Sequence, residues 1–426
     1  MDNWEKRSIR AGSAPVDLVL YDYDHRDHPE ILSIPIQNNL LARTAQDTIR
    51  EIHIDSDNSE LLAAIVSFLT PSEEGTQEKC VESIILRTGE LPNLSNFFAW
   101  SRLPKLQRLH LVGVIHTSVG IHLMSQTTRL TSLNLCNLWA PPPLSIPQLL
   151  SILLSNPNLR ALSLADAMLP SDIDESEIRV PLRRLKTMTL CGEFHPVFSL
   201  LQRLELPAAL NRMELIFNDP LVVEDISRTL GPYMQNRLRH DIGFREKLVV
   251  TCLSGLFVVS PRLEGTSETE CTPEFTISIN DEPSSDITLD LMAFVPYEHV
   301  VCLEMDHSLG MREELFTAMP NIEKLRLRKV SLSDGFLQPD PTGPHANVKL
   351  LPSLRVLCLR DVGADAGWRP LVDYLVHQTS NRQAISLELW GGYSNITPKV
   401  IKEVQGLVEV FHCPGIQGSD LSGDND

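Results

Sequence analysis

The densest group of potential metal ligands is a short tract near the start of the chain. Asp22–His28 contains three aspartates and two histidines, which could supply carboxylate oxygens and imidazole nitrogens. Arg26 lies inside the tract, and its positive charge opposes a bound cation. Charged tracts of this kind are usually solvated loops. We therefore expect no metal and no cofactor at this tract.

The chain lacks the short motifs through which common enzyme classes bind phosphates or activate a nucleophile. It contains no G-x-x-x-x-G-K-[ST], no G-x-G-x-x-G, no G-x-S-x-G and no H-E-x-x-H. The nucleotide-binding, dinucleotide-binding, serine-hydrolase and zinc-protease classes therefore lack their minimal residues. We expect a protein without catalytic activity, with an enzyme as the minor alternative.

The eight cysteines are spread along the chain, and none forms a C-x-x-C pair, so no zinc knuckle or redox dithiol is encoded locally. The first twenty residues contain no apolar stretch of the kind found in signal peptides. The longest apolar stretch, 248–259, is interrupted and too short to cross a bilayer. We expect reduced, mostly buried thiols in a cytoplasmic or nuclear protein.

The overall charge limits the partners that the chain can bind. There are 37 basic and 55 acidic residues among 426, giving a net charge of −18. Such a balance repels phosphate backbones and anionic membranes on average, so we expect neither nucleic acid nor a membrane as partner. Against this background, the run Lys324-Leu325-Arg326-Leu327-Arg328 is a local excess of positive charge.

That run belongs to a recurring phrase, apolar-x-x-apolar-x-apolar, which predicts the elements that position it. Central positions 84, 109, 133, 162, 188 and 213 are spaced by 24 to 29 residues, and the phrase returns around 303, 325, 357 and 387. The last apolar positions alternate with period two, as in a short half-buried strand. Helix-like stretches lie between phrases at 60–66, 147–154, 370–376 and 398–404, and Ser59, Ser145 and Thr397 precede three of them.

Strand–helix units of this length cannot bury their own apolar sides, so they stack on one another. We expect an α/β leucine-rich-repeat solenoid, or horseshoe, with a parallel concave sheet, outer helices and irregular repeats. Its parts would be an N-terminal segment (1–48), leucine-rich repeats (49–218), divergent repeats with an acidic loop (219–299), further leucine-rich repeats (300–413) and a disordered tail (414–426). In the divergent part, we expect strands around 248–250, 275–279 and 287–291, with short or absent helices.

The residues between the apolar positions should face away from the core. Early repeats would present Arg108 and His110, followed by a strip of small neutral side chains. Late repeats would present the cations Lys324, Arg326, Arg328 and Arg360, bordered by Glu304, Asp306 and Glu388, with Trp390 at the rim. Two interpretations remain open: ordinary cross-strand charge pairing, or an anchor for an acidic segment of a protein partner.

The N-terminal sequence resembles a known group of proteins. Trp4-Glu5-Lys6-Arg7-Ser8 followed by Ala11–Leu18 resembles the segment after the F-box in fungal (basidiomycete) F-box-like leucine-rich-repeat proteins. Ile49–Ile54 and the run 103–111 fit the same layout. The resemblance implies that the repeats present a substrate while an F-box docks a cullin-ligase adaptor.

The F-box itself is expected to be missing or degenerate in this chain. It would precede Trp4, where only three residues stand, and Pro35 would interrupt a helix that began at Pro29–Leu32. Our first hypothesis is therefore a non-catalytic interaction scaffold that binds a protein on the concave face. The alternative is a substrate-recognition subunit of a cullin-type (SCF-like) ubiquitin ligase.

Overall fold

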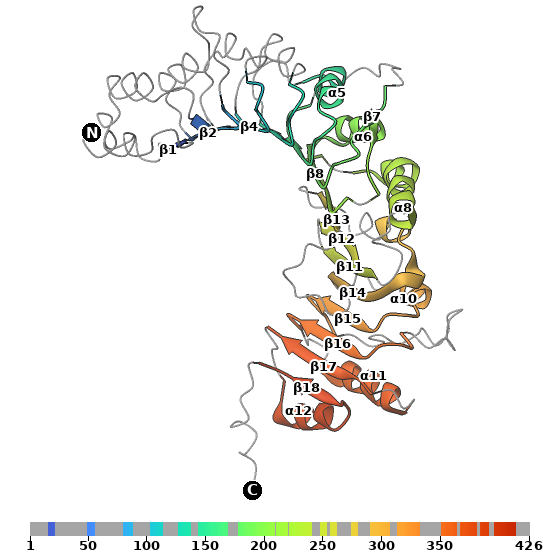
Figure 1. Cartoon of the computed structure of the whole chain (residues 1–426). Coiled ribbons are helices and arrows are strands. Elements are labelled where there is room, and N and C mark those ends of the chain that lie inside the picture. Colours follow the sequence, from blue (N-terminus) through green and yellow to red (C-terminus); the bar gives the residue numbers. More distant parts are fainter. Residues whose placement is uncertain are drawn as a thin grey trace, which may run out of the picture. The chain divides into compact units, whose positions relative to one another are not determined.

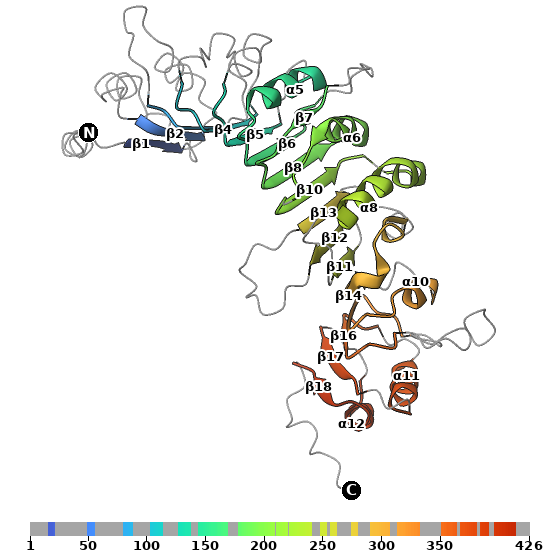
Figure 2. The same cartoon turned by 45° about the vertical axis from the view of Figure 1, so that its right-hand side comes forward.

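The computed structural model describes the following residues: 16–21, 49–55, 80–87, 103–113, 127–137, 144–168, 178–208, 210–219, 221–240, 248–253, 256–261, 274–279, 290–306, 313–332, 351–363, 367–380, 384–391 and 396–414. The chain divides into two compact units, Met1–Asn218 and Asp219–Asp426. Each unit is mixed α/β with a mostly parallel sheet (Figures 1 and 2).

The sheet of the first unit is parallel throughout its described strands. Its order follows the sequence: β1 (Val16–Tyr21), β2 (Ile49–Asp55), β3 (Ser83–Arg87), β4 (Arg108–Val112), β5 (Ser132–Cys136), β6 (Ala161–Ala165), β8 (Thr187–Gly192) and β10 (Arg212–Phe217). A two-stranded ribbon of β7 (Val180–Pro181) and β9 (Leu204–Glu205) lies beside it. The helices are α5 (Ile146–Ser155) and α6 (Phe194–Gln202).

The core of the first unit consists of the predicted apolar positions, which align in rows across the strands. Leu109, Leu133 and Leu162 are neighbours in register on β4, β5 and β6, and each is at most 2% exposed. The row continues through Met188 to Met213. Every apolar position of the phrase in this unit is buried, as the period-two pattern predicts.

Helix α5 begins where the sequence predicts. The Ser145 backbone is extended, and its N–H donates to the Gln148 side chain at 2.9 Å. The helix itself offers no carbonyl acceptor for this N–H. Pro147 stands in the first turn, where its missing N–H costs nothing. Figures 1 and 2 show α5 and α6 on the same side of the sheet, which leaves the outward strand residues on the other side.

The second unit combines an antiparallel part with a parallel part. Its strand order is β13 (Glu274–Ile279), β12 (Leu256–Pro261), β11 (Leu248–Leu253), β14 (Val300–Asp306), β15 (Lys324–Arg328), β16 (Val356–Arg360), β17 (Ser386–Trp390) and β18 (Val410–His412). Strands β11 to β13 pair antiparallel. From β11 through β14 to β18, all pairs are parallel.

Two of the three strands expected within 219–299 are present, as β11 and β13, and the expectation was wrong in two respects. The strands β12 and β13 run antiparallel, because only Ser254 and Gly255 separate β11 from β12 and a parallel connection needs a longer crossover. The helical elements α7 (Val223–Asp225), a π-helical turn η3 (Ile226–Leu230) and α8 (Gly231–His240) precede these strands and follow one another without a break. Leu291, placed on a strand by the sequence, lies in a helical turn.

The parallel part of the second unit keeps the leucine rows. Leu303, Leu325 and Leu357 align on β14, β15 and β16, and all three are fully buried. The row continues through Leu387 to Phe411. The helical elements are η5 (Tyr297–His299), α10 (Glu313–Ala318), α11 (Arg369–Ser380) and α12 (Pro398–Gln405). Figures 1 and 2 show α10 and α11 on the same side of this sheet.

Two details of the phrase in this unit are informative. The helix α12 begins as predicted, since the Thr397 side chain accepts a hydrogen bond from the Val400 N–H at 3.4 Å. The first apolar position before β17, however, is not Ala384, which is exposed, but Ile385, which is 1% exposed. The isoleucine side chain, which is larger than that of Ala384, fills the core from the position one residue later in the chain.

The chain turns in the same way after several strands. The residue that directly follows the strand has a positive φ, between 48° and 77°, at Gly113, Asn137, Asp166, Lys329, Asp361 and Gly391. Its N–H donates to a carbonyl near the end of the next strand in four of the cases, Gly113, Asn137, Asp166 and Asp361, at 2.8 to 3.0 Å. Glycine, asparagine and aspartate are the residues that adopt this conformation most readily.

Several sequence predictions lie outside the described residues: the tract Asp22–His28, the proline-led segment Pro29–Leu32, the helix at 60–66, most of the acidic loop and the tail beyond Pro414. Among the residues that the structure describes, no helix is long and apolar enough to span a bilayer.

Candidate protein-binding site

Five of the predicted site residues lie together on neighbouring strands of the second unit. Lys324, Arg326 and Arg328 are on β15, Arg360 is on β16, and Trp390 is on β17. Arg328, Arg360 and Trp390 stand side by side in register across the three strands. The alternation of the strand produces this arrangement, because Leu325 and Leu327 are buried between the cations.

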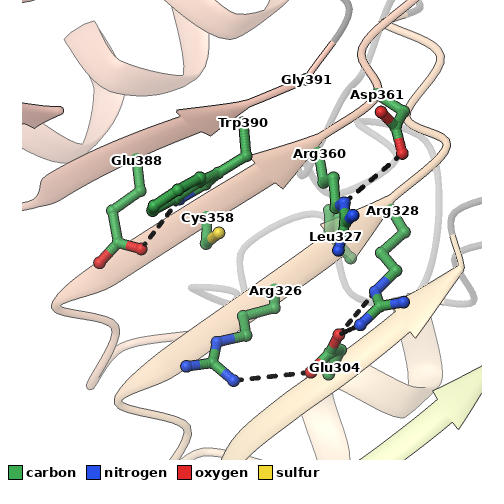
Figure 3. Close-up of a pocket in the computed structure, with 10 residues that line it drawn as sticks. All are labelled: Glu304, Arg326, Leu327, Arg328, Cys358, Arg360, Asp361, Glu388, Trp390 and Gly391. Carbon is green, nitrogen blue, oxygen red and sulfur yellow. Dashed lines mark hydrogen bonds and ion pairs between the residues drawn. The ribbon is translucent and has the colours of Figure 1, made fainter. Parts of the chain in front are cut away.

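The three arginines and Trp390, but not Lys324, line a depression of about 510 Å³ on the outward face of the sheet (Figure 3). Arginines and carboxylates line one part of it, and the indole of Trp390 extends toward Glu388 at the other. Trp390 is 42% exposed, which is high for so large an apolar side chain. The site therefore combines guanidinium donors with an accessible aromatic surface.

Glu304, on β14, holds the two arginines of β15. Arg328 Nε donates to Glu304 Oε1 at 2.6 Å, and Arg326 Nη1 lies 3.6 Å from Glu304 Oε2. The side chain of Glu304 is 13% exposed, and that of Arg326 is 44% exposed. One carboxylate thus serves two guanidinium groups, and only Arg328 is at hydrogen-bond distance in this pair of contacts.

Glu388, on β17, lies between Lys324 and Trp390. Lys324 Nζ is 3.3 Å from Glu388 Oε1, and the Trp390 Nε1–H donates to Glu388 Oε2 at 3.4 Å. Burial acts to raise the pKa of Glu388. The charge and hydrogen bond of Lys324, with further hydrogen bonds from Trp390 and Cys358, outweigh it and hold the pKa below its usual value. The group is therefore a stable carboxylate at neutral pH.

Two further ion pairs complete the face. Arg360 Nε lies 3.7 Å from Oδ2 of Asp361, the next residue, and Lys329 Nζ lies 3.3 Å from Asp306 Oδ2. Five cations thus meet four carboxylates, so the face has an excess of one positive charge (5 − 4 = 1). The predicted cluster of cations is present, and cross-strand pairing compensates most of its charge.

Cys358 lies between Arg326 and Glu388 in the register of the three strands. Burial, and then the negative charge of Glu388, raise the pKa of the Cys358 thiol to about 11. The thiol is therefore neutral at physiological pH and is a poor nucleophile. It contributes a small apolar surface to the site.

Sequence reasoning missed Lys329 and Asp361 as members of this face. Both occupy the position directly after a strand, where the backbone has a positive φ. The sequence contained a signal for this turn, because the residue two positions after the last apolar residue of the phrase is Gly, Asn or Asp at 113, 137, 166, 361 and 391. Lys329 does not fit that composition and carried no signal.

The other two predicted residues, Arg108 and His110, lie on β4 of the first unit and form a separate surface. Arg108 is 3.3 Å from Glu51. A nitrogen of the His110 ring is 2.9 Å from Asn134 Nδ2. Burial, followed by the charges of Arg87 and His53, lowers the pKa of His110, so the ring is neutral at physiological pH.

The cysteines and potential metal ligands are dispersed. Two of the described free thiols, Cys302 and Cys358, are buried. The other four are half-buried: Cys80, Cys136, Cys191 and Cys413. The expectation of mostly buried thiols was therefore wrong for these six. Within the described segments, no three His, Cys, Asp or Glu side chains are close enough to hold a metal ion together.

No protein-family model and no curated protein matches the sequence. The class of the protein is therefore given by its mixed α/β fold with a mostly parallel sheet, and by the charged outward face of β14–β17.

Proposed function

We propose that the chain is a leucine-rich-repeat solenoid that binds a protein partner on the concave face of its sheet and has no catalytic activity. Parallel strands in register, buried leucine rows and the recurring turn after the strand support the repeat interpretation. In such a solenoid, the helices form the outer side, and the strand face opposite to them binds partners.

The observation that carries the proposal is the pair of incompletely engaged arginines beside an exposed tryptophan. The contacts of Arg326 with Glu304 and of Arg360 with Asp361 measure 3.6 and 3.7 Å, beyond hydrogen-bond distance. A carboxylate of a partner could accept hydrogen bonds from either guanidinium without breaking a short contact. Tryptophan and arginine are also the residues most enriched at energetically important positions of protein interfaces.

The proposed ligand is an acidic segment of another protein. An excess of one positive charge, in a chain of net charge −18, attracts a negatively charged segment locally while the rest of the surface repels it. The contribution of each exposed ion pair is about 0.2–1 kcal/mol, so we expect weak, salt-sensitive charge contacts, with burial of Trp390 adding affinity.

Affinity capture with a charge-reversed variant tests the proposal. The chain and Arg326→Glu/Arg328→Glu would each be used to capture partners at low ionic strength, with quantitative mass spectrometry. Arg183→Glu/Arg184→Glu, two exposed arginines of the first unit, makes the same change in net charge elsewhere. We expect a partner set that the control retains and the first variant loses; equal capture by both variants contradicts the proposal.

The same measurement decides the second role that the family resemblance implies. Recovery of a cullin and its adaptor, together with the charge-dependent partner, would identify the chain as a substrate-recognition subunit. Recovery of the partner without ligase subunits would identify it as a scaffold.

A further inference from the structure

The last strand of the second unit brings the end of the described chain to the candidate site. β18 pairs in parallel with β17, with His412 in register with Glu388. The rings of His412 and Trp390 are 5.3 Å apart between centroids. β18 therefore ends level with Glu388, Cys358 and Arg326, and the row of Trp390, Arg360 and Arg328 lies two residues further toward the edge at which the chain leaves the sheet.

The sequence that follows has the composition of a tethered acidic ligand. Residues 415–426 read G-I-Q-G-S-D-L-S-G-D-N-D, with three aspartates, no basic residue and three glycines. Arg360 lies two strands from β18, roughly 10 Å at about 4.8 Å per strand. Asp420 is six residues beyond Pro414, which allows a reach of up to about 20 Å. Asp420 can therefore reach Arg360 and the neighbouring Arg328.

We infer that the segment 415–426 is an intramolecular ligand of the Arg326–Arg328–Arg360 site and competes there with acidic segments of partners. The inference rests on the proposed function, because it assigns a regulation to the same site. Each aspartate–arginine contact is weak, but covalent attachment through a short tether gives an effective concentration of about the millimolar range. The segment thus lowers the apparent affinity of the site for a partner. It excludes partners that bind the site weakly.

Leu421 fits the same arrangement. It directly follows Asp420, so an aspartate at Arg360 brings an apolar side chain within reach of the exposed indole of Trp390. Contact between the two would shield apolar surface that is otherwise open to water. The combination of acid and leucine matches the combination of guanidinium and tryptophan in the site.

The test uses a fluorescein-labelled synthetic peptide with the sequence of residues 415–426. Its binding to the full chain is measured by fluorescence anisotropy at low and high ionic strength. It is compared with binding to Asp420→Asn/Asp424→Asn/Asp426→Asn, in which the tethered segment is neutral. Glu264→Gln/Glu268→Gln/Glu270→Gln changes the net charge equally in the other acidic segment and is the control.

We expect the peptide to bind the aspartate-to-asparagine variant roughly three- to tenfold more tightly than the unaltered chain at low ionic strength, since loss of a few weak ion pairs releases the site. The difference should shrink at high ionic strength, and the control should behave as the unaltered chain does. Addition of Arg326→Glu/Arg328→Glu to the aspartate variant should abolish binding.

Two other outcomes overturn the inference and are distinguishable from each other. Equal binding to the chain and the aspartate variant, still abolished by Arg326→Glu/Arg328→Glu, refutes the tethered ligand and leaves the proposed function intact. No binding to either protein shows that the site has no affinity for this segment. The capture experiment described above then decides separately whether the proposed function fails as well.

Discussion

Arg326 and Arg328 contact the same carboxylate, that of Glu304 on the neighbouring strand. The contact of Arg328 Nε is a short hydrogen bond of 2.6 Å, and that of Arg326 is an ion pair of 3.6 Å. Because one carboxylate compensates two guanidinium groups, the excess positive charge of the face is located here. Glu304 is therefore the residue that limits how strongly these arginines can attract an external acid.

Removal of that carboxylate should have opposite effects on binding and stability. Glu304→Gln removes the negative charge that two neighbouring guanidinium groups share. We expect acidic peptides to bind several-fold more tightly at low ionic strength, and the free energy of unfolding to fall by about 1 kcal/mol. Peptide anisotropy and urea unfolding measure the two quantities.

A matched control is Glu214→Gln, an outward strand residue of the first unit that accepts from Thr189 at 3.2 Å. It makes the same change in charge, and peptide affinity should stay unchanged. Tighter binding in the control as well would show a general effect of net charge and would contradict the role of Glu304.

The lowered pKa of Glu388 predicts a pH dependence of stability. Since the folded state lowers the pKa below the ordinary 4.5, the ionised group stabilises the fold above that pH, and the contribution is lost as the pH falls through the folded-state pKa. The difference in unfolding free energy between the chain and Glu388→Gln should therefore be largest near neutral pH and shrink in acid. Lys324→Met should weaken this dependence, because Lys324 is the largest of the groups that lower the pKa of Glu388. A difference that stays constant with pH in the unaltered background would refute the interpretation.

Cys358 should react slowly with thiol reagents. A pKa of about 11, against an ordinary 9.0, reduces the thiolate fraction about a hundredfold at neutral pH. Peptide mass spectrometry after iodoacetamide treatment should show slow modification of Cys358 in the folded chain and fast modification in urea. The thiol contributes to stability below about pH 9, and this contribution is lost as the pH rises toward 11. Equal rates in the folded and unfolded chain would contradict the assignment.

Gly391 is required by the turn after β17. Its φ is +77°, and a methyl group there would press against Oδ1 of Asp361. We expect Gly391→Ala to lower the free energy of unfolding by about 1–3 kcal/mol. Gly363→Ala, where a methyl would make ordinary contacts, should have little effect. Asp361→Ala in the Gly391→Ala background should recover the steric part of the loss and leave the backbone strain.

Much of the parallel sheet could be predicted from the sequence, because leucine at period-two positions has few alternatives to a half-buried strand. Leu325 and Leu327 are buried, and Lys324, Arg326 and Arg328 face outward, as the alternation requires. The helices α5 and α12 begin at Ser145 and Thr397, because a hydroxyl before a proline-containing first turn is a strong local signal.

The remainder depended on information that is not local. The direction of β12 follows from the two-residue connection after Leu253, but the short apolar runs at 248–261 also fit divergent parallel strands. Four cations of the site and its bordering carboxylates Glu304, Asp306 and Glu388 could be predicted from the sequence. Asp361 could not, because its position results from the turn after β16. Register across strands decides such pairings.

Site-specific photocrosslinking tests the central claim most directly. A photoreactive amino acid would replace Trp390 on the outward sheet face or, in a separate protein, the exposed Lys399 on helix α12. If the outward sheet face binds the partner, the partner retained by the unaltered chain and lost by Arg326→Glu/Arg328→Glu crosslinks from position 390 and not from 399. Crosslinking from 399 alone would place the partner on helix α12 and would contradict binding on the sheet face.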